Sequence, residues 1–223
     1  MNIMLYLMDI FYPTYCLFCL KRGRFICGDC LNRFTYYEQP CCPVCKGVLR
    51  SKKYFIHKIC RKHSYLDGLF AVVHYDKFAK LVLKEAKYHF AYKVLNEIAQ
   101  MMKPQYSNFP FAVDYITYVP LSKTRQNWRG FNQSKILARK LNWKCFELLQ
   151  KSKYTISQAG LHRSQRLTNL RKSFNLIPSM IVTGKTIVLI DDVCTTGATL
   201  QECAKVLKEN GAKYVFALVW AKD

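Results

Sequence analysis

The chain has 223 residues, of which 51% are hydrophobic and 22% are charged. This composition is typical of a folded protein and excludes an extended disordered region, and the length allows one domain with a small second unit. The 35 lysines and arginines against 14 acids give a formal net charge of +21, which favours phosphorylated or polyanionic partners. A basic protein whose charge only keeps it in solution is the alternative.

The first apolar segment, residues 2–12, contains no lysine or arginine and is interrupted by Asp9. It therefore lacks the cationic region of a secretory signal, and it is too short to span a bilayer. Met4, Leu5, Met8 and Phe11 lie on one helical stripe, which predicts a helix packed against the rest of the protein. We expect a cytoplasmic protein without a transmembrane segment, and the sequence leaves contact with the inner face of the membrane open.

The next segment carries cysteines in pairs that are separated by two residues. With a final Cys-x-x-His pair, these are Cys16 and Cys19, Cys27 and Cys30, Cys42 and Cys45, and Cys60 and His63. Such spacing directs both side chains at one ion, so the pairs predict two four-coordinate zinc sites. Sites closed by four protein ligands predict structural zinc that stabilises a small head. Disulfides or buried free thiols are the alternatives, and the spacing does not decide between sequential and cross-braced pairing.

Beyond the cysteines the pattern changes, which predicts a head over residues 1–67 and a second domain over residues 68–223. In chain order the hydrophobic patterns predict a strand at 69–75, a helix at 78–102, a strand at 115–119, a helix at 133–141, a strand at 186–190, a helix at 199–210 and a strand at 214–219. Alternating strands and helices predict an α/β fold with a parallel sheet that is covered on both faces.

The most informative motif runs from Val188 to Leu200, where an apolar strand is followed by two acids and a hydroxyl-rich turn that opens a helix. Ligands bind at such carboxyl ends of strands. Helix N–H groups and hydroxyls can surround a phosphate, and adjacent acids can accept sugar hydroxyls or share Mg²⁺. A capped helix with solvated acids is the alternative. The candidate binding residues are Asp191, Asp192, Val193, Cys194, Thr195, Thr196, Gly197, Ala198 and Thr199.

This motif resembles the segment of type I phosphoribosyltransferases that binds 5-phosphoribosyl 1-diphosphate (PRPP). The resemblance implies that Asp191 and Asp192 meet the ribose hydroxyls, as catalytic acids, and that the following turn binds the 5-phosphate with Mg²⁺ bound alongside. It also implies that Leu121, Ser122 and Lys123 correspond to the loop that binds the diphosphate, although Lys123 as a solvated surface charge is an alternative.

Further motifs are similar to those of ComF-type competence proteins, as is the cysteine-rich head. They are Val119-Pro120-Leu121-Ser122, then Arg129-Gly130-Phe131-Asn132-Gln133, then Gln158, Leu161, Arg166, Asn169 and Phe174. One departure is His63, where relatives commonly have a cysteine. Arg129 and Asn132 would either bind an anion or cap the following helix. The resemblance implies a role in natural transformation, in which single-stranded DNA enters the cytoplasm.

Residues 151–172 are strongly basic and resemble the mobile hood of phosphoribosyltransferases. Cations in a strip can follow a nucleic-acid backbone, and Tyr154 and Phe174 could stack on bases. A solvated loop is the alternative, and the basic cluster of Lys21, Arg22 and Arg24 has the same two interpretations. The candidate nucleic-acid-binding residues are Lys151, Lys153, Arg163, Arg166, Arg171 and Lys172.

Two functions follow from these motifs. One is a competence protein that binds PRPP and single-stranded DNA and handles transforming DNA; the other is an active transferase that moves ribose 5-phosphate from PRPP to a base. The hood shows no apolar slot for a base, so we expect the first. A third possibility is a head that docks partner proteins such as a DNA helicase.

Overall fold

The computed structural model describes residues 13–47, 49, 55–87, 91–107, 109–141, 144–152 and 173–223. The helix predicted within residues 2–12 and residues 153–172 of the hood lie outside this part of the chain. Among the helices that are described, none combines the length and apolar character that a membrane crossing requires.

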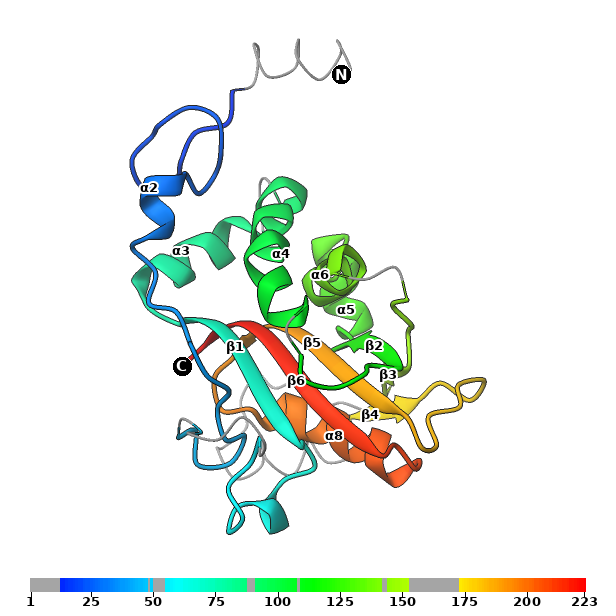
Figure 1. The fold of residues 1–223 in the computed structure, drawn as a ribbon. Coiled ribbons are helices and arrows are strands. Elements are labelled where there is room, and N and C mark those ends of the chain that lie inside the picture. Colours follow the sequence, from blue (N-terminus) through cyan, green and yellow to red (C-terminus); the bar gives the residue numbers. More distant parts are fainter. Residues whose placement is uncertain are drawn as a thin grey trace, which may run out of the picture.

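The centre of the fold is a four-stranded parallel sheet (Figure 1). In spatial order its strands are β1 (Gly68–His74), β6 (Tyr214–Lys222), β5 (Thr186–Cys194) and β2 (Tyr115–Tyr118). All three neighbouring pairs are parallel. The predicted parallel sheet is confirmed, and its carboxyl edge is where the acid pair of β5 lies.

Helices cover both faces of the sheet because the strand residues are apolar on both sides. On one face, Phe70, Leu218 and Trp220 belong to a core shared with α3 (Lys77–Glu85), α4 (Ala91–Ser107) and α6 (Gln133–Leu141). On the other face, Ala217 and Val219 pack in a core shared with α8 (Ala198–Glu209). The two cores explain the near-continuous apolar runs of β5 and β6.

Three predicted boundaries were wrong, those of the helix at 78–102 and of the strand ends at 190 and 219. The single helix expected over residues 78–102 is divided between α3 and α4. The C-cap of α3 is Ala86, and because alanine is the strongest helix former, the local sequence does not indicate this end. The strand expected to end at Ile190 continues to Cys194. It does so because β6 also extends, pairing Asp191 with Val219 and Cys194 with Lys222.

Five short elements complete the described structure. Helix α5 (Lys123–Arg129) follows β2, and the helical turns α2 (Gly28–Leu31) and η1 (Arg61–His63) lie in the head. Strands β3 (Leu149–Lys151) and β4 (Phe174–Leu176) form an antiparallel pair on either side of residues 153–172. This pair fixes the base of the basic segment.

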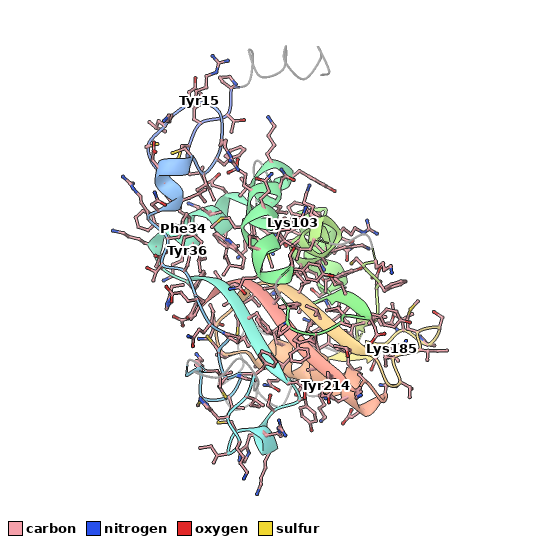
Figure 2. All side chains as sticks on the ribbon, viewed as in Figure 1. Tyr15, Phe34, Tyr36, Lys103, Lys185 and Tyr214 are labelled. Atoms are coloured by element: carbon pink, nitrogen blue, oxygen red, sulfur yellow. The ribbon has the colours of Figure 1, made fainter. Side chains whose placement is uncertain are left out.

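The head packs directly against the sheet and its helices. Residues 36–41 run antiparallel along β1, where the Tyr37 N–H donates to Val72 O at 2.9 Å and the Cys41 N–H donates to Leu69 O at 2.8 Å. Phe34 lies where the head meets α3 (Figure 2), with its ring 5.9 Å from that of Trp220. We propose residue 68, where β1 begins, as the boundary between head and second domain.

Candidate functional site

Four cysteines of the first half of the head converge on one point. The Sγ atoms of Cys16, Cys19, Cys27 and Cys30 all lie within 4.8 Å of one another. Each is a soft thiolate donor, and four of them suit a tetrahedral zinc ion. Burial alone would raise the pKa of Cys16, but N–H groups of Cys27, Phe18 and Cys19 lower it to about 6. Cys16 therefore favours the thiolate form that binds metal, whereas burial, followed by the neighbouring Cys27, raises the pKa of Cys30 to about 12.

The second cluster corrects one predicted ligand. It consists of Cys42, Cys45, His57 and Cys60, with the Nδ1 atom of His57 3.2 Å from Cys45 Sγ. His63 is not part of it, because η1 places this residue on the exposed side of the turn that follows Cys60. The prediction of His63 was wrong. His57 stands three residues before Cys60, the spacing of the cysteine pairs, and this is the signal that could have identified it.

The two clusters share one local backbone geometry, and their pairing is sequential. In both first knuckles the residue after the second cysteine has positive φ, 62° at Leu20 and 62° at Lys46. Its N–H donates to the carbonyl of the first cysteine at 3.0 Å in each case. A left-handed conformation is unfavourable for these residues, so the knuckle must impose it. The head thus contains two copies of one metal-binding turn.

At the carboxyl edge of the sheet, Asp191 is held in a fixed position. Its Oδ1 accepts a hydrogen bond from Ser134 Oγ at 2.7 Å and one from the Asp192 N–H at 2.9 Å. Asp192 is half-buried, and no cation pairs with it within the described residues. Burial, followed by the charge of Asp192, raises the pKa of Asp191 well above its ordinary value. Two adjacent acids without a cation form a site that suits Mg²⁺ or hydroxyl donors.

Sequence reasoning missed Ser134. It lies in α6 and is buried, and it shares a helical face with Leu137, Ala138 and Leu141. A serine at a core-facing position is the signal that could have identified it, because a buried hydroxyl needs a partner. Here that partner is Asp191.

The turn after β5 has the geometry of an anion site. Gly197 is the N-cap of α8 with φ 78°, a conformation that favours glycine. Thr195 and Thr196 are exposed, and Thr196 Oγ1 accepts the Ala198 N–H at 3.3 Å. The N–H groups of the first turn of a twelve-residue helix have no acceptors within the helix. Phosphate binding by these groups is consistent with the helix dipole.

The raised pKa of Asp191 predicts that this carboxylate destabilises the free protein at neutral pH. A pKa higher in the folded than in the unfolded state gives stability that is present below about pH 4 and is lost as pH rises. Asp191→Asn, which keeps an acceptor for Ser134, should raise Tm at pH 7 by about 2–4 °C. Thermal melts at pH 7 and pH 4 check this, since the difference should shrink at pH 4. An unchanged or lower Tm at pH 7 would contradict it.

The Arg129 to Gln133 motif organises the loop after β2. Asn132 caps α6 by accepting the Lys135 N–H at 3.2 Å, and its side-chain amide donates to Val119 O at 3.0 Å. Asn132 therefore caps the helix, one of the two roles considered for it. Arg129 donates to Gln133 Oε1 at 3.4 Å, while its buried Nε has no partner within the described residues.

The proposed diphosphate loop leads from β2 into α5. Leu121 and Ser122 are half-buried, and Ser122 Oγ accepts the Arg125 N–H at 3.3 Å as the N-cap of α5. The backbone of Lys123 begins this helix, and its side chain lies outside the described part. The Val119 N–H donates to Ile190 O at 3.0 Å, which places this loop beside the strand that carries the acids.

The basic candidates are only partly described. Lys151 is half-buried with its Nζ 5.6 Å from the centre of the Phe174 ring, and burial followed by the charge of Arg125 lowers its pKa. Lys153, Arg163, Arg166, Arg171 and Lys172 lie outside the described residues. In the head, Lys21 pairs with Asp29 at 3.3 Å and Arg24 donates to Gln100 at 2.9 Å. These two cations therefore have structural partners.

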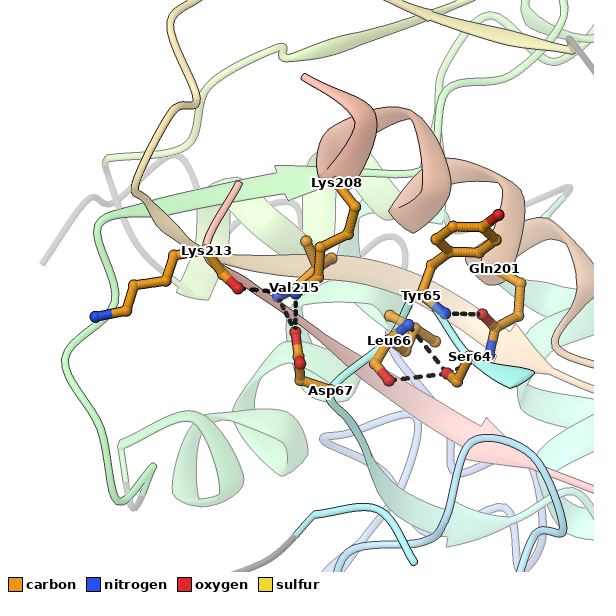
Figure 3. Close-up of polar contacts among 8 residues, drawn as sticks. All are labelled: Ser64, Tyr65, Leu66, Asp67, Gln201, Lys208, Lys213 and Val215. Carbon is orange, nitrogen blue, oxygen red and sulfur yellow. Dashed lines mark hydrogen bonds and ion pairs between the residues drawn. The ribbon is translucent and has the colours of Figure 1, made fainter. Parts of the chain in front are cut away.

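Residues 64–67, which follow the second zinc cluster, are held to α8 by hydrogen bonds and an ion pair (Figure 3). The side chain of Gln201 accepts the Tyr65 N–H at 2.9 Å and donates to Ser64 Oγ at 2.9 Å. Asp67 accepts the Val215 N–H and pairs with Lys208, each at 2.7 Å. The helix that begins at the hydroxyl-rich turn is thus fixed to the head and to β6 together.

Comparisons with known proteins agree with this arrangement. The phosphoribosyl transferase domain matches residues 128–223, and the double zinc ribbon domain matches residues 7–62. Competence protein ComFC of Streptococcus pneumoniae is 30% identical over 199 residues, covering 87% of each chain. DNA utilization protein YhgH of Salmonella typhimurium is 33% identical over 207 residues, covering 91% of this chain and 86% of its own. The chain belongs to the ComF family.

Membership of the ComF family extends over both halves of the chain. ComFC of Bacillus subtilis, for example, is 27% identical over 213 residues, covering 87% of this chain and 82% of its own. The predicted fold class is confirmed: a phosphoribosyltransferase-type α/β domain preceded by a cysteine-rich double zinc ribbon. Zinc is structural in this ComF protein, since each cluster closes with four protein donors.

Proposed function

We propose that the chain binds PRPP together with Mg²⁺ at the carboxyl edge of its sheet, binds single-stranded DNA, and handles transforming DNA during natural transformation. The same proposal includes a cytoplasmic location, with contact to the inner face of the membrane, and a DNA helicase as a partner. The observation that carries it is the restrained acid pair of β5 beside the N-terminus of α8.

The acid pair and the following turn supply complementary parts of a PRPP site. Asp191, fixed by Ser134, can accept a ribose hydroxyl, while Asp192 has no cationic partner within the described residues and is free to share Mg²⁺ or a second hydroxyl. The exposed hydroxyls of Thr195 and Thr196 and the first N–H groups of α8 provide donors for the 5-phosphate. Mg²⁺ would offset the repulsion between the acids and the diphosphate.

The DNA part of the proposal rests on charge and on family membership. Relatives across the ComF family are named competence proteins or DNA utilization proteins. The net charge of +21 gives this chain the field that attracts a polyanion. The sequence places a dense group of these cations in residues 151–172, between two strands of the transferase-type domain.

Charge reversal in the hood should weaken DNA binding. Arg163→Glu with Arg166→Glu removes two potential phosphate contacts, so the slope of log affinity against log salt for a single-stranded oligonucleotide should become shallower by about 1.4. Fluorescence anisotropy across a salt series measures this. Asp191→Ala is the comparison variant and should leave the affinity and the slope unchanged. A double variant that binds as the wild type does would rule out the hood as a DNA contact.

The second candidate function is transfer of ribose 5-phosphate to a base, and it requires the same acid pair. Diphosphate release in the presence of PRPP, Mg²⁺ and each common base distinguishes the two. Release with one base would establish catalysis, whereas binding of PRPP without release would assign the site a regulatory or structural role.

A further inference from the structure

A recessed surface lies at the opposite edge of the sheet from the acid pair. It is a cavity of about 600 Å³ lined by residues of the head, of the loop before β2 and of the strand starts. Thr186 begins β5 and Tyr214 begins β6, whereas Asp191 lies toward the far end of β5. At about 3.3 Å per residue, Thr186 and Asp191 are roughly 17 Å apart. The cavity is therefore separate from the proposed PRPP site.

We call this surface the aromatic cleft and define it by Phe55, Arg61, Phe111, Tyr214 and Phe216. The rings of Phe111 and Phe216 stack with centres 4.0 Å apart and an angle of 17° between their planes. Tyr214 lies 6.3 Å from Phe216 at the rim and is 44% exposed. An exposed ring beside a stacked pair offers a flat apolar face to a planar ligand.

Cations surround the rim of the aromatic cleft. The Nζ atoms of Lys213 and Lys208 lie 5.4 Å and 5.7 Å from the centre of the Tyr214 ring. The backbone carbonyl of Lys185 accepts the N–H groups of Lys213 at 2.9 Å and of Tyr214 at 3.2 Å. Arg61 is exposed on η1 and has no acidic partner within the described residues. These cations can contact phosphates beside a ligand that stacks on Tyr214.

The acids near the aromatic cleft are already neutralised. Asp67 accepts the Val215 N–H and pairs with Lys208 at 2.7 Å, as Figure 3 shows. Asp114, which precedes β2, accepts the Thr186 N–H at 2.8 Å and pairs with Lys185 at 3.4 Å. The remaining charge is that of Arg61 and Lys213, so the cleft combines an aromatic wall with a net positive rim. Charge complementarity therefore favours an anionic chain with planar groups over an apolar peptide.

We propose that the aromatic cleft binds unpaired bases of single-stranded DNA, with Tyr214 stacking on a base and with Arg61 and Lys213 contacting the adjacent phosphates. This inference deepens the proposed function and rests on its DNA-binding part. It adds a contact site formed by the head and the amino edge of the sheet, distinct from the hood. Base stacking on aromatic side chains with phosphates on flanking cations is how proteins bind single strands without sequence preference.

The test compares oligonucleotide binding by three tyrosine variants, measured by fluorescence anisotropy. Tyr214→Ala should weaken binding about tenfold, since loss of one stacked base costs about 1–3 kcal/mol. Tyr214→Phe keeps the ring and should bind as the wild type does. Tyr92→Ala, on the exposed face of α4 and 66% exposed, is the matched control and should have no effect.

The cations are tested separately. Lys213→Ala should reduce the salt slope by about 0.7, the value for one phosphate contact on a single strand. Arg61→Ala should do the same, with zinc content measured because Arg61 follows Cys60. Arg33→Ala, an exposed arginine of the first zinc unit, is the control.

The outcomes separate this inference from the proposed function. If Tyr214→Ala binds DNA normally while the Arg163 and Arg166 variant does not, the aromatic cleft is excluded and DNA binding stands. If the wild-type protein binds no single-stranded DNA, both fail. Crosslinking of an oligonucleotide containing 5-iododeoxyuridine to the peptide that carries Tyr214 would support the cleft directly, and crosslinks confined to the hood would overturn it.

Discussion

Replacing Asp191 and Asp192 together with alanine should abolish magnesium-dependent binding of PRPP. Each charge-assisted hydrogen bond or ion contact that is lost costs roughly 1.5–3 kcal/mol, so two losses weaken binding by at least about a hundredfold. Both acids are at the carboxyl edge of the sheet, and Ser134 already fixes one of them at 2.7 Å. Isothermal titration calorimetry with PRPP, with and without Mg²⁺, measures the effect.

The control for this experiment removes the same number of charges elsewhere. Glu38→Ala with Glu209→Ala changes two exposed acids, one in the head and one at the far end of α8. It should retain the wild-type affinity for PRPP. If the Asp191 and Asp192 variant binds PRPP with wild-type affinity, PRPP does not bind at the proposed site. If both double variants lose affinity for PRPP equally, the loss is a general effect of net charge.

Replacing His57 with alanine should destabilise the second zinc site and leave the first intact. The two clusters predict two zinc ions per chain. Loss of one of four ligands should release one zinc at a chelator concentration that leaves the other bound, because structural zinc affinity and folding of the unit are coupled. A colorimetric zinc assay during chelator titration measures the two steps, and Tm should fall as the second unit loosens.

The comparison variant is His63→Ala. His63 is an exposed histidine six residues away that lies outside the cluster, so its replacement should leave both zinc ions and the melting temperature unchanged. Zinc loss from His63→Ala together with retention in His57→Ala would contradict the ligand set.

Sequence alone determined the class of the fold and the position of the acid pair. The apolar runs at 186–190 and 214–219 are too continuous for a sheet with one solvent-exposed face. Their alternation with helical segments is typical of parallel strands. The run of two acids, a hydroxyl-rich turn and a helix is local, so its chemistry could be predicted from neighbours in the chain. The helix at 133–141 was predicted with its observed bounds for the same reason.

Only the tertiary structure decided the features that depend on distant partners. His57 and His63 have the same spacing from Cys60, and only folding of the knuckle brings Nδ1 of His57 to 3.2 Å from Cys45. Ser134 meets Asp191 because α6 packs on β5, 57 residues along the chain. Strands β5 and β6 extend beyond their predicted ends because each supplies the other's hydrogen bonds. Local sequence cannot specify such contacts, since their free energy comes from groups that meet only when the chain has folded.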